Sequence, residues 1–232
     1  MNHDKLDLKE QHFNYNSTTS FGDYRVEISQ DSDPLNPRVD YDNLGQMLCW
    51  HRSYNLGDEH NYSSPNEFFH DESGLYPDEN TDFLTDTEMI HCMATVENNG
   101  VLLPLFLYDH GGITMSTGAF SCPWDSGQVG VIYISKTDIL KEYGGKYLTK
   151  NLRERVTSYL ISDVKVYDYY LTGSVYGYNI TKVDDDGEEE DIDSCWGYMG
   201  YHTDDDGYML SVIRNAIQYD ITNSSQQLEM TL

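Results

Sequence analysis

Residues 101–135, VLLPLFLYDHGGITMSTGAFSCPWDSGQVGVIYIS, decide the fold, because they hold the longest apolar run of the chain, Val101 to Tyr108. The polar turn at residues 109–112, Asp-His-Gly-Gly, separates this run from a second β-prone run that begins at Ile113. Two strand-forming runs joined by a short glycine-containing link are typical of a β-hairpin, since the link can adopt positive φ. The stretch therefore predicts a hairpin at the centre of the chain.

A second polar segment, residues 121–128, leads into the run Val129 to Ile134. This run is almost entirely apolar and rich in β-branched residues, which is typical of a strand buried on both faces. Two polar loops that carry Asp, His, Cys, Trp and Ser would then flank one buried sheet.

Helix and strand signals continue on both sides of this centre. Thr85 and Glu88 have the spacing of a capping box, and Ser135 with Asp138 forms an acidic variant of it. Residues 58–80 are acidic, contain two prolines and Gly74, and are expected to wrap the surface. The expected helices run from Thr85 to Gly100, from Ser135 to Gly144, from Thr149 to Gly173 (the longest) and from Tyr208 to Tyr219; the expected strands are Tyr24 to Ile28, Ser174 to Val183 and Ile192 to Met199, with an acidic turn at Asp184 to Glu190.

These elements predict an α+β fold, a single domain in which a mixed or antiparallel sheet with hairpins packs against about four helices. A chain of 232 residues buries one good core and does not require a second domain. We expect the domain to span residues 24–221. Residues 1–23 would form a flexible polar N-terminal arm, and residues 222–232 a polar tail.

The charge of the chain is its most extreme property. Forty Asp and Glu residues against 14 Lys and Arg give a formal net charge of -26 at pH 7. Such an excess repels DNA, RNA and anionic membranes, so we expect no direct binding to nucleic acid. It attracts basic surfaces, including protein surfaces that normally hold nucleic acid. A merely solvated surface of the kind found in halophiles is the simpler alternative.

Aromatic content and cysteine usage add two further expectations. The chain has 20 tyrosines, and tyrosine suits protein contact surfaces because it combines a large apolar face with a polar tip. Residues 1–16 are polar, without the apolar core of a signal peptide, and no run approaches the length of a membrane span. The cysteines form no CxxC pair, which is typical of reduced, mostly buried thiols in a cytosolic protein; they are Cys49, Cys92, Cys122 and Cys195.

Metal and phosphate signatures are weak. The acidic run at residues 184–187 lacks EF-hand spacing, because Lys182 stands where the first carboxylate ligand would be needed. Cys49 and His51 with the scattered cysteines lack the paired spacing of structural zinc sites. Neither GxxxxGK[ST] nor GxGxxG occurs. We therefore expect no metal and no cofactor.

A nucleophilic site is conceivable in the central loops. Cys122 shares a loop with Asp125 and Ser126, and His110 lies at the neighbouring hairpin tip, so that a Cys–His or Ser–His pair with an aspartate orienter would be possible. The alternative is a packed turn in which Asp125 accepts backbone hydrogen bonds, and the sequence favours it. Further members of an active site in this region would be His51 and Arg52.

Five segments carry a resemblance to known proteins: DNLGQMLCWHRSYNLGD (42–58), LYDHGGITMS (107–116), FSCPWDSGQVGVIYIS (120–135), LTGSVYGY (171–178) and DSCWGY (193–198). In these segments the chain resembles a family of small bacteriophage- and prophage-encoded proteins of largely unassigned function. The resemblance runs from about Pro37 to Met199, and CPWDSGQVG is its most specific part. It implies a phage accessory protein that acts in the cytoplasm of a bacterial host, and it supplies no catalytic residues.

Charge and resemblance together predict a phage-encoded acidic inhibitor of a host defence or nucleic-acid-acting protein. It would occupy a basic surface of that protein in the manner of a DNA mimic. The alternatives are a small cytosolic enzyme built on the loops around His110 and Cys122, and a virion or assembly protein; the partner's identity, stoichiometry and oligomeric state stay open. The residues expected to bind the partner are Asp184, Asp185, Asp186, Glu188, Glu189, Glu190, Asp204, Asp205, Asp206, Tyr176, Tyr178 and Tyr208.

Overall fold

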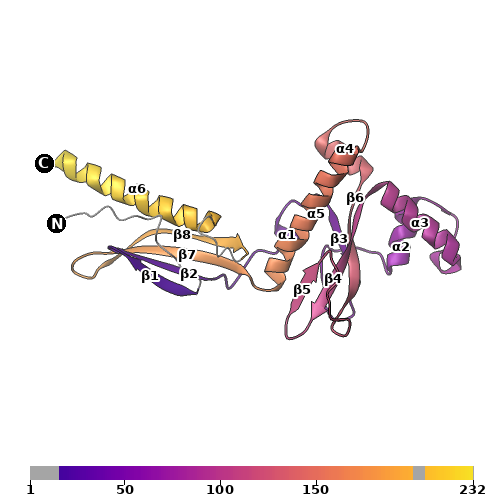
Figure 1. Ribbon diagram of the computed structural model, residues 1–232, viewed down its shortest axis with the longest axis horizontal. Coiled ribbons are helices and arrows are strands. Elements are labelled where there is room, and N and C mark those ends of the chain that lie inside the picture. Colours follow the sequence, from indigo (N-terminus) through magenta and orange to yellow (C-terminus); the bar gives the residue numbers. More distant parts are fainter. Residues whose placement is uncertain (1–15, 201–206, 232) are drawn as a thin grey trace. The chain divides into compact units, whose positions relative to one another are not determined.

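A computed structural model describes the backbone of residues 16–200 and 207–231, and side chains as far as residue 224. The described residues form six α-helices and two four-stranded antiparallel sheets, which confirms the predicted α+β class (Figure 1). Internal contacts divide the chain into two compact units. We call residues 36–172 the central unit, and residues 1–35 with 173–232 the terminal unit.

The sheet of the central unit has the strand order β3-β6-β4-β5. Its strands are β3 (Gln46–Cys49), β4 (Gly100–Asp109), β5 (Ile113–Ser116) and β6 (Ser126–Ser135). The predicted hairpin is confirmed as β4 and β5, which pair antiparallel across the turn. The strand predicted to be buried on both faces is β6, and it lies inside the sheet between β3 and β4.

Helices cover both faces of this sheet (Figure 1). On one face α5 (Lys150–Leu171) packs Leu160 and Val164 against Leu105 and Ile132. On the other face α2 (Pro65–Ser73) and α3 (Asp86–Asn98) form a second cluster that includes Phe68, Val96 and Tyr133. The central unit is therefore a three-layer arrangement, completed by α1 (Pro37–Asp40), the 3-10 helix η1 (Thr81–Phe83) and α4 (Lys136–Tyr143).

The sheet of the terminal unit has the order β1-β2-β7-β8. Its strands are β1 (Ser17–Phe21), β2 (Tyr24–Gln30), β7 (Val175–Val183) and β8 (Glu189–Met199). The helix α6 (Tyr208–Thr231) covers one face, where Ile213 and Ile217 pack against residues such as Val26 and Ile180 (Figure 1). The predicted acidic hairpin is confirmed as the pair β7 and β8.

Helix starts follow the capping signals of the sequence. Thr85 and Glu88 make both hydrogen bonds of a capping box at the start of α3. Ser135 caps α4 by accepting from the backbone N–H of Asp138, and Thr149 caps α5 in the same way. Each cap satisfies a backbone donor that the helix itself leaves without a partner.

Three boundaries differ from the predictions. Residues 17–21, assigned to the flexible arm, form β1 and pair with β2. The segment 58–80, in which no helix was expected, contains α2, because Ser64 caps the helix, Pro65 occupies its first turn and Gly74 ends it at φ 65°. The backbone of α6 continues through the predicted polar tail to Thr231, so α6 with 24 residues is longer than α5 with 22.

Candidate functional site

The turn between β7 and β8 concentrates negative charge on an ordered hairpin. Seven of the eight residues from 184 to 191 carry carboxylates, and all seven are exposed. The Asp184 carboxylate accepts hydrogen bonds from the backbone N–H groups of Asp186, at 3.0 Å, and Glu188, at 2.8 Å. Asp184 thus organises the turn, while its neighbours face solvent; we call residues 184–191 the acidic hairpin.

Few cations compensate this hairpin. Within the described residues it makes one ion pair, between Arg25 and Glu189. Lys182, on the adjoining part of β7, is directed instead to Asp220 at 2.8 Å. Most of the hairpin's charge is therefore available to a partner.

The tyrosines predicted to accompany these carboxylates differ in their surroundings. Tyr208 is exposed, and Tyr176 is partly buried. Tyr178 is only 1% exposed, and its hydroxyl donates to Asp193 at 2.7 Å, so the prediction of a contact role for Tyr178 is wrong: its ring belongs to the core. Asp204, Asp205 and Asp206 lie outside the described residues.

The loops around β5 bring His110, Cys122, Asp125 and Ser126 together, as the sequence suggested. The backbone N–H of Asp109 donates to the Asp125 carbonyl at 2.8 Å, which joins the two loops. His110 Nδ1 lies 3.3 Å from Asp125 Oδ2, and the Cys122 thiol donates to the same oxygen at 3.6 Å. We call these four residues the loop cluster.

The geometry of the loop cluster differs from that of a catalytic triad. Asp125 stands between the imidazole and the thiol, whereas nucleophilic catalysis needs a hydrogen bond between nucleophile and base. The Ser126 hydroxyl donates to the Cys122 carbonyl at 2.5 Å, so it closes the turn. The His110 side chain is 71% exposed, and Trp124, which precedes Asp125 in the chain, is 92% exposed. The Asp125 carboxylate thus contacts the side chains of His110 and Cys122, whereas the expected turn would have it accept backbone N–H groups.

His51 reaches this region through a tyrosine that the sequence analysis missed. The rings of His51 and Tyr54 stack with centroids 4.9 Å apart, and Tyr54 donates to Asp109 Oδ2 at 3.0 Å. This hydrogen bond raises the pKa of Tyr54. Arg52 is exposed and takes no part in these contacts. The three-residue spacing between His51 and Tyr54 could have suggested that their rings meet, but no local pattern indicated the hydrogen bond from Tyr54 to Asp109.

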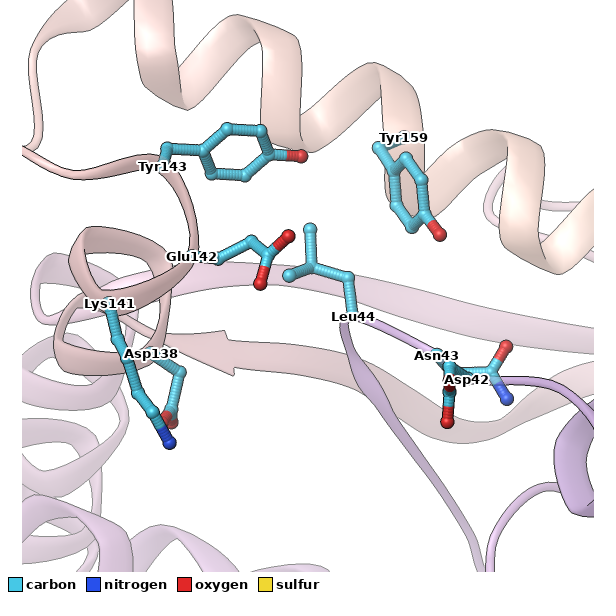
Figure 2. A pocket seen from close by; sticks show the side chains of 8 residues that line it. All are labelled: Asp42, Asn43, Leu44, Asp138, Lys141, Glu142, Tyr143 and Tyr159. Carbon is cyan, nitrogen blue, oxygen red and sulfur yellow. The ribbon is translucent and has the colours of Figure 1, made fainter.

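A groove in the central unit is a third candidate (Figure 2). In this view the rings of Tyr143 and Tyr159 lie along one side, with Glu142 and Leu44 between them, while Asp138 and Lys141 extend away from the rings. The cavity has a volume of about 380 Å³ and is lined by Asp42, Asn43, Leu44, Asp138, Lys141, Glu142, Tyr143 and Tyr159. We call it the tyrosine groove.

Three separate segments build the tyrosine groove, which is why no sequence pattern revealed it. The loop at residues 42–44 is fixed by Asn43, whose side-chain amide donates to the carbonyls of Pro37 and Tyr41. The α4 wall is anchored by the buried side chain of Ile139. Burial, together with nearby Asp163, raises the pKa of Tyr159 on α5, so its hydroxyl keeps its proton at neutral pH.

The described residues offer no metal centre and no membrane-spanning helix. Among residues 16–200 and 207–224, no group of three or more His, Cys, Asp and Glu side chains is arranged to hold a metal ion. Burial raises the pKa of Cys49 to about 12, so this thiol stays protonated. Within residues 16–200 and 207–231 no helix has the length and apolar character needed to span a bilayer.

Comparisons with family models, curated proteins and solved structures gave no match.

Proposed function

We propose that this protein is an inhibitor that binds a basic surface of a partner protein through the acidic hairpin. The observation that carries the proposal is the exposure of seven carboxylates on a hydrogen-bonded turn with one ion pair among the described residues. An ordered hairpin presents this charge without the entropy cost of ordering a flexible segment on binding. Concentrated charge also accelerates association with an oppositely charged surface.

The proposed targets are host defence or nucleic-acid-acting proteins in the cytoplasm of a bacterium. Proteins that bind DNA or RNA carry clustered Lys and Arg, which are the side chains the hairpin would attract. The resemblance to bacteriophage and prophage proteins supports a host target of this kind. The exposed ring of Tyr208 lies beside Tyr198, at the end of β8 opposite the acidic hairpin, so it would anchor a partner whose surface extends along that strand.

The direct test compares two variants that lose the same charge in different places. The hairpin variant carries Glu188→Gln, Glu189→Gln and Glu190→Gln and keeps Asp184 for the turn. The control variant carries Asp78→Asn, Asp82→Asn and Glu97→Gln, three exposed sites of the central unit. Partners captured from host lysate at low salt would be identified and their affinity measured with purified proteins.

The proposal expects a partner whose affinity falls steeply with added salt and falls further with the hairpin variant than with the control variant. An affinity that is insensitive to salt would count against it. Equal losses for both variants would show that net charge, rather than the hairpin, drives binding.

A catalytic function at the loop cluster is the second candidate, and one observation favours it: His110 and Cys122 both contact the Asp125 carboxylate. Labelling with iodoacetamide distinguishes a catalytic Cys122 from a structural one, with the exposed Cys195 as internal reference. Much faster labelling of Cys122 than of Cys195 at neutral pH would favour catalysis. Slow labelling, with partner binding intact in Cys122→Ala, would leave the loop cluster a structural turn.

A further inference from the structure

We propose that the tyrosine groove binds an arginine side chain of a protein partner. This site goes beyond the acidic hairpin, because it lies in the central unit and uses none of the hairpin's residues. A guanidinium would lie against the Tyr159 ring and pair with the Glu142 carboxylate. The two sites can therefore be tested, and can fail, separately.

The charge of the groove favours a cation. Asp42, Asp138 and Glu142 line it, against Lys141 as the one cationic lining residue. In Figure 2 the Lys141 side chain extends away from the tyrosine rings, whereas Glu142 lies between them and Leu44. With the nearby Arg155 counted, and with Arg38 and Asp163, which pair with each other and act on Tyr159, four carboxylates stand against three cations. A carboxylate beside aromatic rings, without a cation of its own, is a suitable place for a basic side chain.

The rings of the groove specify the kind of cation. The Arg155 guanidinium already lies 4.8 Å from the centroid of the Tyr143 ring, so this wall accepts a guanidinium from within the chain. The neighbouring Tyr159 is 41% exposed, and no cation lies over its ring within the described residues. Arginine fits this site better than lysine, because its planar group stacks on a ring while it donates two hydrogen bonds to a carboxylate.

The groove is formed before any ligand arrives. Arg38 Nη2 donates to the Gly45 carbonyl at 2.7 Å, and Asn43 donates to two carbonyls, so the loop at residues 42–44 is held at both ends. Tyr159 stands on α5, and its neighbour Leu160 is fully buried. A rigid site loses little conformational entropy on binding, which allows one side chain to contribute measurable affinity.

The experiment uses the full chain and three blocked pentapeptides, Gly-Gly-Xaa-Gly-Gly, in which Xaa is arginine, lysine or citrulline. Citrulline keeps the shape of arginine and removes its charge. Titration calorimetry gives the affinities, and the perturbed signals of Tyr143 and Tyr159 in NMR spectra locate the contact. The arginine peptide is expected to bind with 1:1 stoichiometry, the lysine peptide more weakly, and the citrulline peptide not at all.

Two substitutions are expected to weaken binding of the arginine peptide about 5- to 10-fold each, Glu142→Gln by removing the ion pair and Tyr159→Leu by removing the stacking ring. Glu97→Gln and Tyr147→Leu are the matched controls, since both sites are exposed and lie outside the groove. Circular dichroism verifies folding, and Glu142→Gln, at an exposed site, keeps the test valid if Tyr159→Leu fails to fold.

Three results would overturn the inference. The first is equal binding of the citrulline and arginine peptides. The second is an equal loss of affinity in Glu97→Gln and Glu142→Gln, which would indicate non-specific attraction to an acidic protein. The third is loss of peptide binding in the hairpin variant alone, which would place the peptide on the acidic hairpin and leave the proposed function standing without this site.

Discussion

Arg38 and Asp58 form a two-point ion pair inside the central unit: Nε donates to Oδ1 at 2.8 Å and Nη2 donates to Oδ2 at 2.6 Å. The Arg38 side chain is only 1% exposed. Its Nη1 reaches Asp163 of α5 at 3.3 Å, while Asp58 also accepts the backbone N–H of Met47 on β3 at 2.8 Å. One guanidinium therefore connects α1, β3, α5 and the loop that borders the tyrosine groove.

Replacing this arginine is expected to destabilise the fold strongly. Arg38→Met keeps much of the side-chain volume but leaves the carboxylates of Asp58 and Asp163 without their cation, so the free energy of unfolding should fall by about 3–5 kcal/mol. Urea denaturation at neutral pH measures the change. Arg52→Met, at an exposed arginine of the same unit, is the control and should change stability by less than about 0.5 kcal/mol. A similar small change for both variants would show that the buried pair contributes little.

The pH dependence of the terminal unit should report on Asp220. Its Oδ2 accepts from the Tyr24 hydroxyl at 2.6 Å and from Lys182 Nζ at 2.8 Å. Burial alone would raise the pKa of Asp220, but these two hydrogen bonds outweigh burial and lower it from 3.8. Because the folded pKa lies below the unfolded one, the ionised carboxylate stabilises the protein above pH 3.8, and this stability is lost as pH falls through the lower value.

Asp220→Asn is the corresponding variant. Since the group is partly exposed, we expect it to lower the free energy of unfolding by about 1 kcal/mol at pH 7. The difference from the unmodified protein should shrink below pH 3.8, where the carboxyl gains its proton. Urea denaturation of both proteins from pH 7 down to pH 3 measures it. A difference that is constant over this range would show that the charge of Asp220 is not what stabilises the unit.

Local patterns predicted much of the fold. Thr85 with Glu88, Ser135 and Thr149 marked helix starts correctly, because a cap is a contact within four residues. The apolar run of β6 indicated a strand buried on both faces, since burial depends on composition. What could not be predicted was which strands pair: the terminal sheet joins β2 to β7 across about 150 residues, and no local signal specifies such a contact.

The candidate sites could likewise be predicted only where their residues are close in the sequence. The acidic hairpin was visible because its carboxylates are contiguous, and the loop cluster because its two loops flank one predicted hairpin. The error at Tyr178 arose because strand residues alternate between faces, and the face of Tyr178 is set by its pairing with Ile28 of β2. The tyrosine groove depends on three segments that only the fold assembles.

Gly177 and Trp196 provide a test of packing on the β7–β8 pair. A Cβ atom at Gly177 would lie 2.1 Å from Trp196 Cε3 and 2.9 Å from the Cys195 carbonyl oxygen. The Trp196 ring therefore covers the strand glycine Gly177. Gly177→Ala must displace the ring and should destabilise the protein by about 1–3 kcal/mol, as measured by thermal and urea denaturation.

A double-mutant cycle with Trp196→Ala identifies the cause. With the ring removed, the cost of Gly177→Ala should fall but not vanish, because the Cys195 carbonyl oxygen remains close. If both backgrounds show the same cost, the backbone contact rather than the indole is responsible.

Substitution of two adjacent aspartates distinguishes the contribution of turn geometry from that of charge in the acidic hairpin. Asp184 accepts two backbone hydrogen bonds, whereas the Asp185 side chain makes none within the described residues. Asp184→Ala and Asp185→Ala remove one negative charge each, but only Asp184→Ala removes the acceptor that organises the turn. We therefore expect Asp184→Ala to lower the free energy of unfolding by about 1 kcal/mol and Asp185→Ala to leave it nearly unchanged. Asp184→Asn, which loses the charge and keeps an acceptor oxygen, should restore most of the difference; if it is as unstable as Asp184→Ala, the charge rather than the acceptor stabilises the turn.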